Sequence, residues 1–67
     1  MIRAKFVCDV SEGGEIAMRA VVGGSPENDE FFSYTPSGSL VMAIVNEETA
    51  AQFIPGREYY LDFTPAG

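Results

Sequence analysis

The chain has no histidine, one cysteine, and only 4 lysines and arginines against 10 aspartates and glutamates. Without histidine there is no imidazole base, so a histidine-based catalytic triad is excluded. One cysteine forms no disulfide within the chain, and a structural zinc site needs about four cysteine or histidine ligands. The formal net charge of -6 opposes binding to bulk nucleic acid, whose phosphates attract basic surfaces.

Long hydrophobic runs are also missing. The apolar run at 40–45 is far shorter than the roughly 18 residues of a membrane span, so no membrane partner is expected. The first ten residues carry charges within an alternating pattern, which is unlike a signal peptide. At 67 residues and 46% hydrophobic content, the chain is predicted to form a single domain, 1–67, with a flexible tail at 64–67.

Alternating apolar residues between glycine and proline turns indicate β-strands. Every second residue from 2 to 10 is apolar, which is typical of a half-buried strand. Gly13 and Gly14 then favour a hairpin turn. The run at 40–45 is apolar on both faces, which suits a strand buried on both sides or packed against a partner chain. The predicted strands are 2–10, 15–22, 31–35, 40–45 and 57–63.

Helix signals are shorter. Ser25 followed by Pro26 resembles a helix start, but the aromatic residues after it favour a strand, so one turn at most is expected. Asn46 can cap a helix over 47–53. We therefore predict a mainly β fold, a small antiparallel sheet or barrel of about five strands with one short helix. Such a small core is marginal, so a homo-oligomer is expected.

The segment 23–39 is the first candidate for chemistry, because it combines glycines, serines and prolines with three aromatic residues. The tripeptide Ser37–Ser39 can present backbone N–H groups and hydroxyls to an anion. Phe31 and Tyr34 offer flat faces on which a base can stack. Arg19 is alone on its strand and can meet a phosphate. The alternative is two turns around one aromatic strand that fills a small core.

Two further features have plainer interpretations. Cys8 alternates with Phe6 and Val10, so a buried, inert thiol is expected. The acidic residues at 27–30 lack the ligand spacing and central glycine of a calcium-binding loop, so a solvated turn is expected. Because no catalytic set is paired by sequence, we predict no enzymatic activity and no cofactor.

Four stretches of the chain carry a resemblance. They are Gly24–Phe32, Tyr34–Ser39, Pro55–Tyr60 and Asp62–Ala66, and their central motif reads GSPEN-x-EFF-x-YTPSGS. This pattern resembles a family of small bacteriophage proteins. The resemblance implies a viral protein of the host bacterial cytoplasm that sequesters, without cleaving, a cyclic nucleotide signal of anti-phage defence such as CBASS or Thoeris. The residues it implies for ligand binding are Ser25, Asn28, Phe31, Tyr34, Thr35, Ser37 and Ser39.

Two other functions stay open at this point. A virion structural or accessory protein, such as a decoration or head-tail component, would use the run at 40–45 as a docking strand. A single-stranded nucleic-acid binder on a small barrel would use the aromatic residues, although the acidic balance opposes it. The hypothesis of a protein that sequesters a cyclic nucleotide places the ligand pocket between subunits, because a chain this short encloses little by itself.

Overall fold

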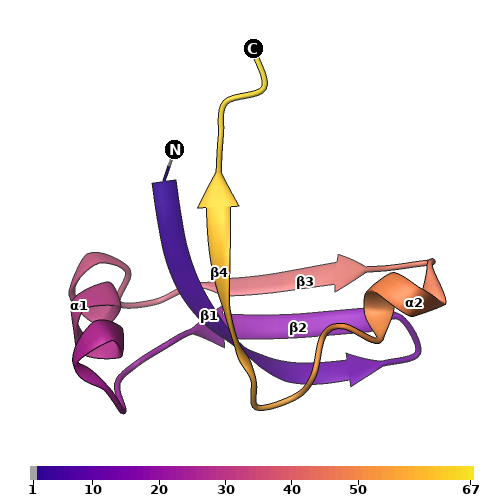
Figure 1. The fold of residues 1–67 in the computed structure, drawn as a ribbon, viewed down its shortest axis with the longest axis horizontal. Helices are drawn as coiled ribbons and strands as arrows, with labels where there is room; N and C mark the ends of the chain where they lie inside the picture. The colour runs from indigo at the N-terminus through magenta and orange to yellow at the C-terminus, as the bar shows by residue number, and fades with distance from the viewer. Residues whose placement is uncertain (1) are drawn as a thin grey trace.

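The computed structural model describes residues 2–67, which form one antiparallel sheet with a short helix near each end (Figure 1). The elements are β1 (Ile2–Glu12), β2 (Glu15–Ala20), α1 (Pro26–Tyr34), β3 (Ser39–Ala43), α2 (Glu47–Ala50) and β4 (Glu58–Phe63). The strands lie in the order β3-β2-β1-β4. The mainly β prediction is confirmed, but the sheet is open rather than a barrel and has four strands rather than five.

The first strand, β1, is shared by the two halves of the sheet. Its residues 2–7 pair with β4, and its residues 6–12 pair with β2. The register shifts between Cys8 and Val10, so Asp9 forms a bulge that bends the strand. In Figure 1 this bend turns β4 across the direction of β2 and β3.

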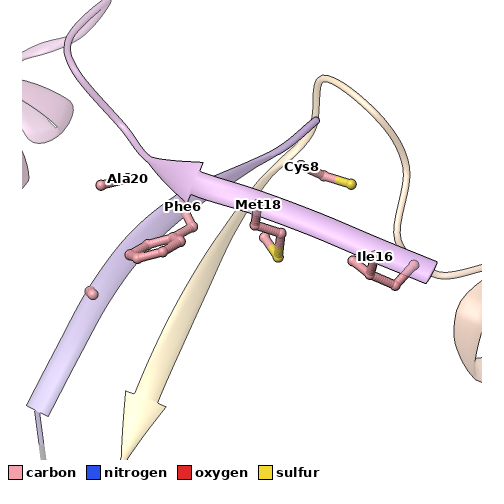
Figure 2. Packing of buried hydrophobic residues seen from close by; sticks show 6 residues of the cluster. Phe6, Cys8, Ile16, Met18 and Ala20 are labelled. Atoms are coloured by element: carbon pink, nitrogen blue, oxygen red, sulfur yellow. The ribbon is translucent and has the colours of Figure 1, made fainter. Parts of the chain in front are cut away.

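The core lies on one side of the sheet, which we call the apolar face. The apolar face is formed by Ile2, Ala4, Phe6, Cys8, Ile16, Met18, Ala20, Leu40, Met42, Tyr59, Leu61 and Phe63. Figure 2 shows how Phe6, Met18 and Ile16 follow one another along this face. Cys8 is buried beside them, as the alternation predicts. On the opposite side, the polar face, the strands carry most of their charged residues.

The predicted strand at 31–35 is wrong, because these residues continue the helix α1. The helix starts as the sequence signal indicates: the Ser25 hydroxyl accepts from the backbone N–H of Asn28 at 3.1 Å, and Pro26 takes the first position. It ends where the N–H of Thr35 donates to the Phe31 carbonyl at 2.8 Å, just before a proline. The strand preference of the aromatic residues yields here to tertiary packing.

The third strand and the second helix also differ from their predictions. β3 covers Ser39–Ala43 rather than 40–45 and is an edge strand, with Val41 68% exposed and Val45 beyond it 96% exposed. It is therefore not buried on both faces. α2 begins at the predicted cap, where Asn46 accepts from the N–H of Thr49 at 3.0 Å. It ends at Ala50, earlier than predicted.

Candidate functional site

Charged side chains of β1 and β4 meet on the polar face, where α1 docks. The register pairs Arg3 with Asp62 and Lys5 with Tyr60, so these side chains point to the same side of the sheet. The first turn of α1 adds Glu27 to them. We call these residues, together with Asn28, Phe31 and Glu58, the polar cluster.

Lys5 is the centre of the polar cluster. Its side chain is only 11% exposed, and its ammonium lies 2.5 Å from Glu27 Oε2 and 3.5 Å from Glu58 Oε1. The hydroxyl of Tyr60 donates to Glu27 Oε1 at 2.7 Å. The hydrogen bond from Lys5, followed by that from Tyr60, lowers the pKa of Glu27, and the same contacts raise the pKa of both donors. The carboxylate of Glu27 therefore ties α1 to two strands at once.

Arg3 extends this network along the strand pair. Its Nε and Nη2 groups donate to the two carboxylate oxygens of Asp62 at 2.6 and 3.0 Å, a bidentate pair. The pair lowers the pKa of Asp62 through the hydrogen bond and raises that of Arg3. The guanidinium also lies 4.7 Å from the ring centroid of Tyr60. Neither cation of β1 is therefore left free for a phosphate.

Asn28 and Phe31 fasten the inner side of α1. Asn28 is buried, and its Nδ2 group donates to the Gly23 carbonyl at 3.0 Å and to Glu58 Oε2 at 2.7 Å. The ring of Phe31 packs against that of Tyr60, with centroids 6.1 Å apart. Both residues are predicted ligand contacts, but the structure uses them to hold α1 on the sheet.

The predicted ligand residues therefore separate into two groups. Ser25, Asn28 and Phe31 belong to the start and inner face of α1, where Ser25 is the N-cap. The others lie along the segment that leads from the end of α1 into β3, or opposite the start of β3, and we call them the Tyr34 corner. Its members are Arg19, Tyr34, Thr35, Ser37 and Ser39.

The Tyr34 corner is exposed. Tyr34 is 76% exposed, and within residues 2–67 no hydrogen bond engages the side-chain hydroxyl of Tyr34, Ser37 or Ser39. Arg19 lies directly across from Ser39 in the β2–β3 register. Its Nε group donates to Asp9 Oδ1 at 3.0 Å, while no partner within residues 2–67 takes its Nη groups. The Tyr34 corner therefore exposes an aromatic ring and serine hydroxyls on the segment before and at the start of β3, with a guanidinium opposite Ser39.

The glycine of the Ser37–Ser39 tripeptide has a packing role. A Cβ on Gly38 would lie 3.0 Å from Cζ of Phe6, so a larger residue there would have to displace the core ring. The carbonyl of Gly38 accepts from the N–H of Ala20 at 3.0 Å. This tripeptide is therefore held against the core by its central residue, with a serine on either side of it.

A surface cavity of about 730 Å³ lies away from both groups. It is lined by the β1–β2 turn, the residues after β3, and α2. Glu12, Glu15 and Glu47 make its rim acidic, which is unsuited to a phosphate. Within residues 2–67 no group of three or more His, Cys, Asp or Glu side chains is arranged to hold a metal ion. Nor is any helix in this range long and apolar enough to cross a membrane.

Sequence reasoning missed most of the polar cluster. Alternation places Lys5 and Tyr60 on polar faces of their strands, but which strands are neighbours is not visible in that pattern. The only local signal was Glu27 in the first turn of a capped helix. Comparison of the chain with protein family models, with curated proteins and with solved structures gave no match.

Proposed function

We propose that the protein is a non-enzymatic binding protein that captures a small nucleotide at the Tyr34 corner. The observation that supports it is the exposed ring of Tyr34 on the same short segment as the unengaged hydroxyls of Ser37 and Ser39, with the guanidinium of Arg19 opposite Ser39. An aromatic ring offers a stacking surface, and the hydroxyls and guanidinium offer donors to a phosphate. In keeping with the resemblance to bacteriophage proteins, the ligand class is a cyclic nucleotide signal of bacterial anti-phage defence.

The electrostatics favour a small ligand over a nucleic acid. The net charge is -6, and the cations of the polar cluster are both engaged by carboxylates. A long polyanion would meet this acidic surface over its whole length, whereas a small ligand needs only the local field at Arg19. The corner is open on the solvent side, so we propose that a second chain completes the enclosure.

The direct test is a binding measurement by calorimetry and thermal shift. A panel of cyclic dinucleotides, cyclic trinucleotides and cyclic ADP-ribose isomers is added to the purified chain. One class should raise the melting temperature, and Tyr34→Ala and Arg19→Gln should each weaken its binding about tenfold, in line with the stacking and charged hydrogen-bond energies involved. Arg57→Gln, an exposed arginine outside the corner, is the matched control.

The contrary result is equally clear. If no member of the panel raises the melting temperature at millimolar concentration, the nucleotide proposal is wrong. If binding occurs but Arg57→Gln weakens it as much as Arg19→Gln does, the ligand lies outside the Tyr34 corner. Release of the ligand unchanged after denaturation distinguishes capture from cleavage.

One observation favours a second function, that of a virion accessory protein. β3 is an open edge of the sheet, and the exposed Val41 and Val45 follow that edge. An unpaired strand edge with apolar side chains can accept a strand from another protein. Mass spectrometry of purified virions tests this function, since abundant peptides of this chain in particles would favour it over nucleotide capture.

A further inference from the structure

The bent sheet covers its own apolar face only in part. β4 crosses the direction of β2 and β3 (Figure 1), and Phe6, Ile16 and Met18 in the middle of the face are buried. Toward its end the face is open, since Ile2 and Phe63 are exposed. The extents of the molecule are 34 × 33 × 16 Å, and its radius of gyration of 12.5 Å exceeds the roughly 11 Å expected for a compact chain of this length. Sheets normally bury the whole of such a face against a second layer.

The chain exposes more surface than a compact monomer of its mass. The chain exposes 4785 Å², whereas a folded monomer of its mass exposes about 4,100 Å². This excess of about 700 Å² belongs to the whole chain and includes the exposed tail at 64–67, and it is comparable with the roughly 800 Å² that each partner contributes to a standard protein interface. Much of the uncovered surface is apolar: Ile2 is 70% and Phe63 56% exposed, and Leu40, Met42 and Leu61 are only partly buried.

Charge identifies the occupant. By the strand register no charged side chain points into the apolar face, although Asp62 contributes to the lining of the hollow there, whereas the rest of the surface carries the excess of 10 acidic over 4 basic residues. A basic partner would be drawn to those acidic surfaces rather than to this neutral face. Two copies of the chain repel each other least when their neutral faces meet and their carboxylates point away.

The apolar face carries a hollow and exposed apolar side chains next to it. The hollow has a volume of about 430 Å³, and its lining includes Met18, Leu40, Met42, Leu61 and Phe63. At the end of the sheet, Ile2 is paired with Phe63, and both are exposed. A two-fold axis through the face would place Ile2 and Phe63 of each chain against the hollow of the other, as an isologous interface requires.

We propose that two copies of this chain pack apolar face to apolar face, forming a two-layer sandwich with the sheets about 10 Å apart. This dimer does not depend on the nucleotide proposal, because the face that it buries carries none of the Tyr34 corner residues. It is a different interface from the one proposed to enclose the nucleotide. The occupant is the second copy rather than another protein, by the area and the charge given above.

The test compares two substitutions on edge strands. Phe63→Lys places a charge on the apolar face at a position that the single chain leaves exposed, so the fold should survive. Val41→Lys makes the same change on the polar side of β3 and is the matched control. By sedimentation and native mass spectrometry, the wild type at about 100 µM should be a dimer, and Phe63→Lys should raise its dissociation constant at least about tenfold. Val41→Lys should leave it unchanged, and circular dichroism should show that all three chains are folded.

A second measurement needs no substitution on the face. In a mixture of chains with and without ¹³C-labelled methionine methyl groups, the partly exposed Met42 should show contacts between chains. A monomer at 100 µM, a dimer that resists Phe63→Lys, or a dimer broken by Val41→Lys would each overturn the proposal. Absence of the inter-chain methionine contacts in a confirmed dimer would overturn it as well.

Discussion

The amide of Asn28 offers the sharpest test of how α1 is held. Its Nδ2 group donates at 3.0 Å to the neutral Gly23 carbonyl and at 2.7 Å to the Glu58 carboxylate. A neutral hydrogen bond contributes about 1 kcal/mol and a charged one about 2 kcal/mol. Asn28→Asp removes both donors and sets two carboxylates against each other, so we expect a loss of about 3–4 kcal/mol or more. A chain of this length has about 3–10 kcal/mol in total, so the variant should be barely folded.

The control is the same substitution on the other helix. Asn46 caps α2 with its side-chain oxygen, and aspartate caps a helix as well as asparagine does. Asn46→Asp adds the same charge to the chain and should change the free energy of unfolding by less than about 0.5 kcal/mol. Urea unfolding followed by circular dichroism at neutral pH measures both variants.

A reciprocal exchange separates the hydrogen bond from the charge. Glu58→Gln in the Asn28→Asp background restores one amide donor and one carboxylate at positions 28 and 58, with their places exchanged. The double variant should therefore recover a large part of the lost free energy of unfolding. The contact of Glu58 with Lys5 at 3.5 Å is lost in this exchange, so recovery is incomplete. If Asn28→Asp costs no more than Asn46→Asp, the amide does not hold the helix, and it would then be available to a ligand.

Two further predictions concern the turn and acid stability. Gly13 and Gly14 both have positive φ, so a substitution by alanine costs about 1 kcal/mol of stability at either position. At Gly14 the added Cβ would also lie 2.6 Å from the carbonyl oxygen of Ile44, whereas at Gly13 it would meet nothing within 4 Å. Gly14→Ala should therefore destabilise by about 1–3 kcal/mol more than Gly13→Ala in urea unfolding, and equal losses would contradict the close approach. The lowered pKa of Glu27 means that its contribution is complete above its ordinary value of 4.5 and is lost as the pH falls through the folded-state value. Glu27→Gln should flatten the decline of stability below pH 4.5, and an unchanged acid profile would show that the contact with Lys5 contributes nothing.

Local signals predicted where elements begin better than where they end. The caps at Ser25 and Asn46 were both recognised, because a cap depends on neighbouring residues alone. The continuation of α1 through Phe31 was not, since aromatic residues favour strands unless a partner packs against them on a helix. That partner is Tyr60, which is 29 residues away and enters only through the register of β4.

The apolar run of β3 shows a second limit of sequence reasoning. Its two apolar faces favoured a strand buried on both sides, but the strand lies at the edge of the sheet and Val41 is exposed. Periodicity reports that a residue is apolar and not which surface covers it. For the candidate site, the sequence placed Asn28 and Phe31 in one predicted ligand set with the residues of the Tyr34 corner, and it did not indicate that these two hold α1 on the sheet.

The split pairing of β1 has a consequence for the order of folding. Its pairing with β2 closes through a short turn, whereas its pairing with β4 joins Arg3 to Asp62, almost the whole chain apart. Closing the longer loop costs more entropy, so the hairpin of β1 and β2 should form early and β4 late. During synthesis, β1 keeps one edge unpaired until the last strand is made. Before then, that edge is open to pairing with a neighbouring nascent chain, so the final strand also protects the protein from misassembly.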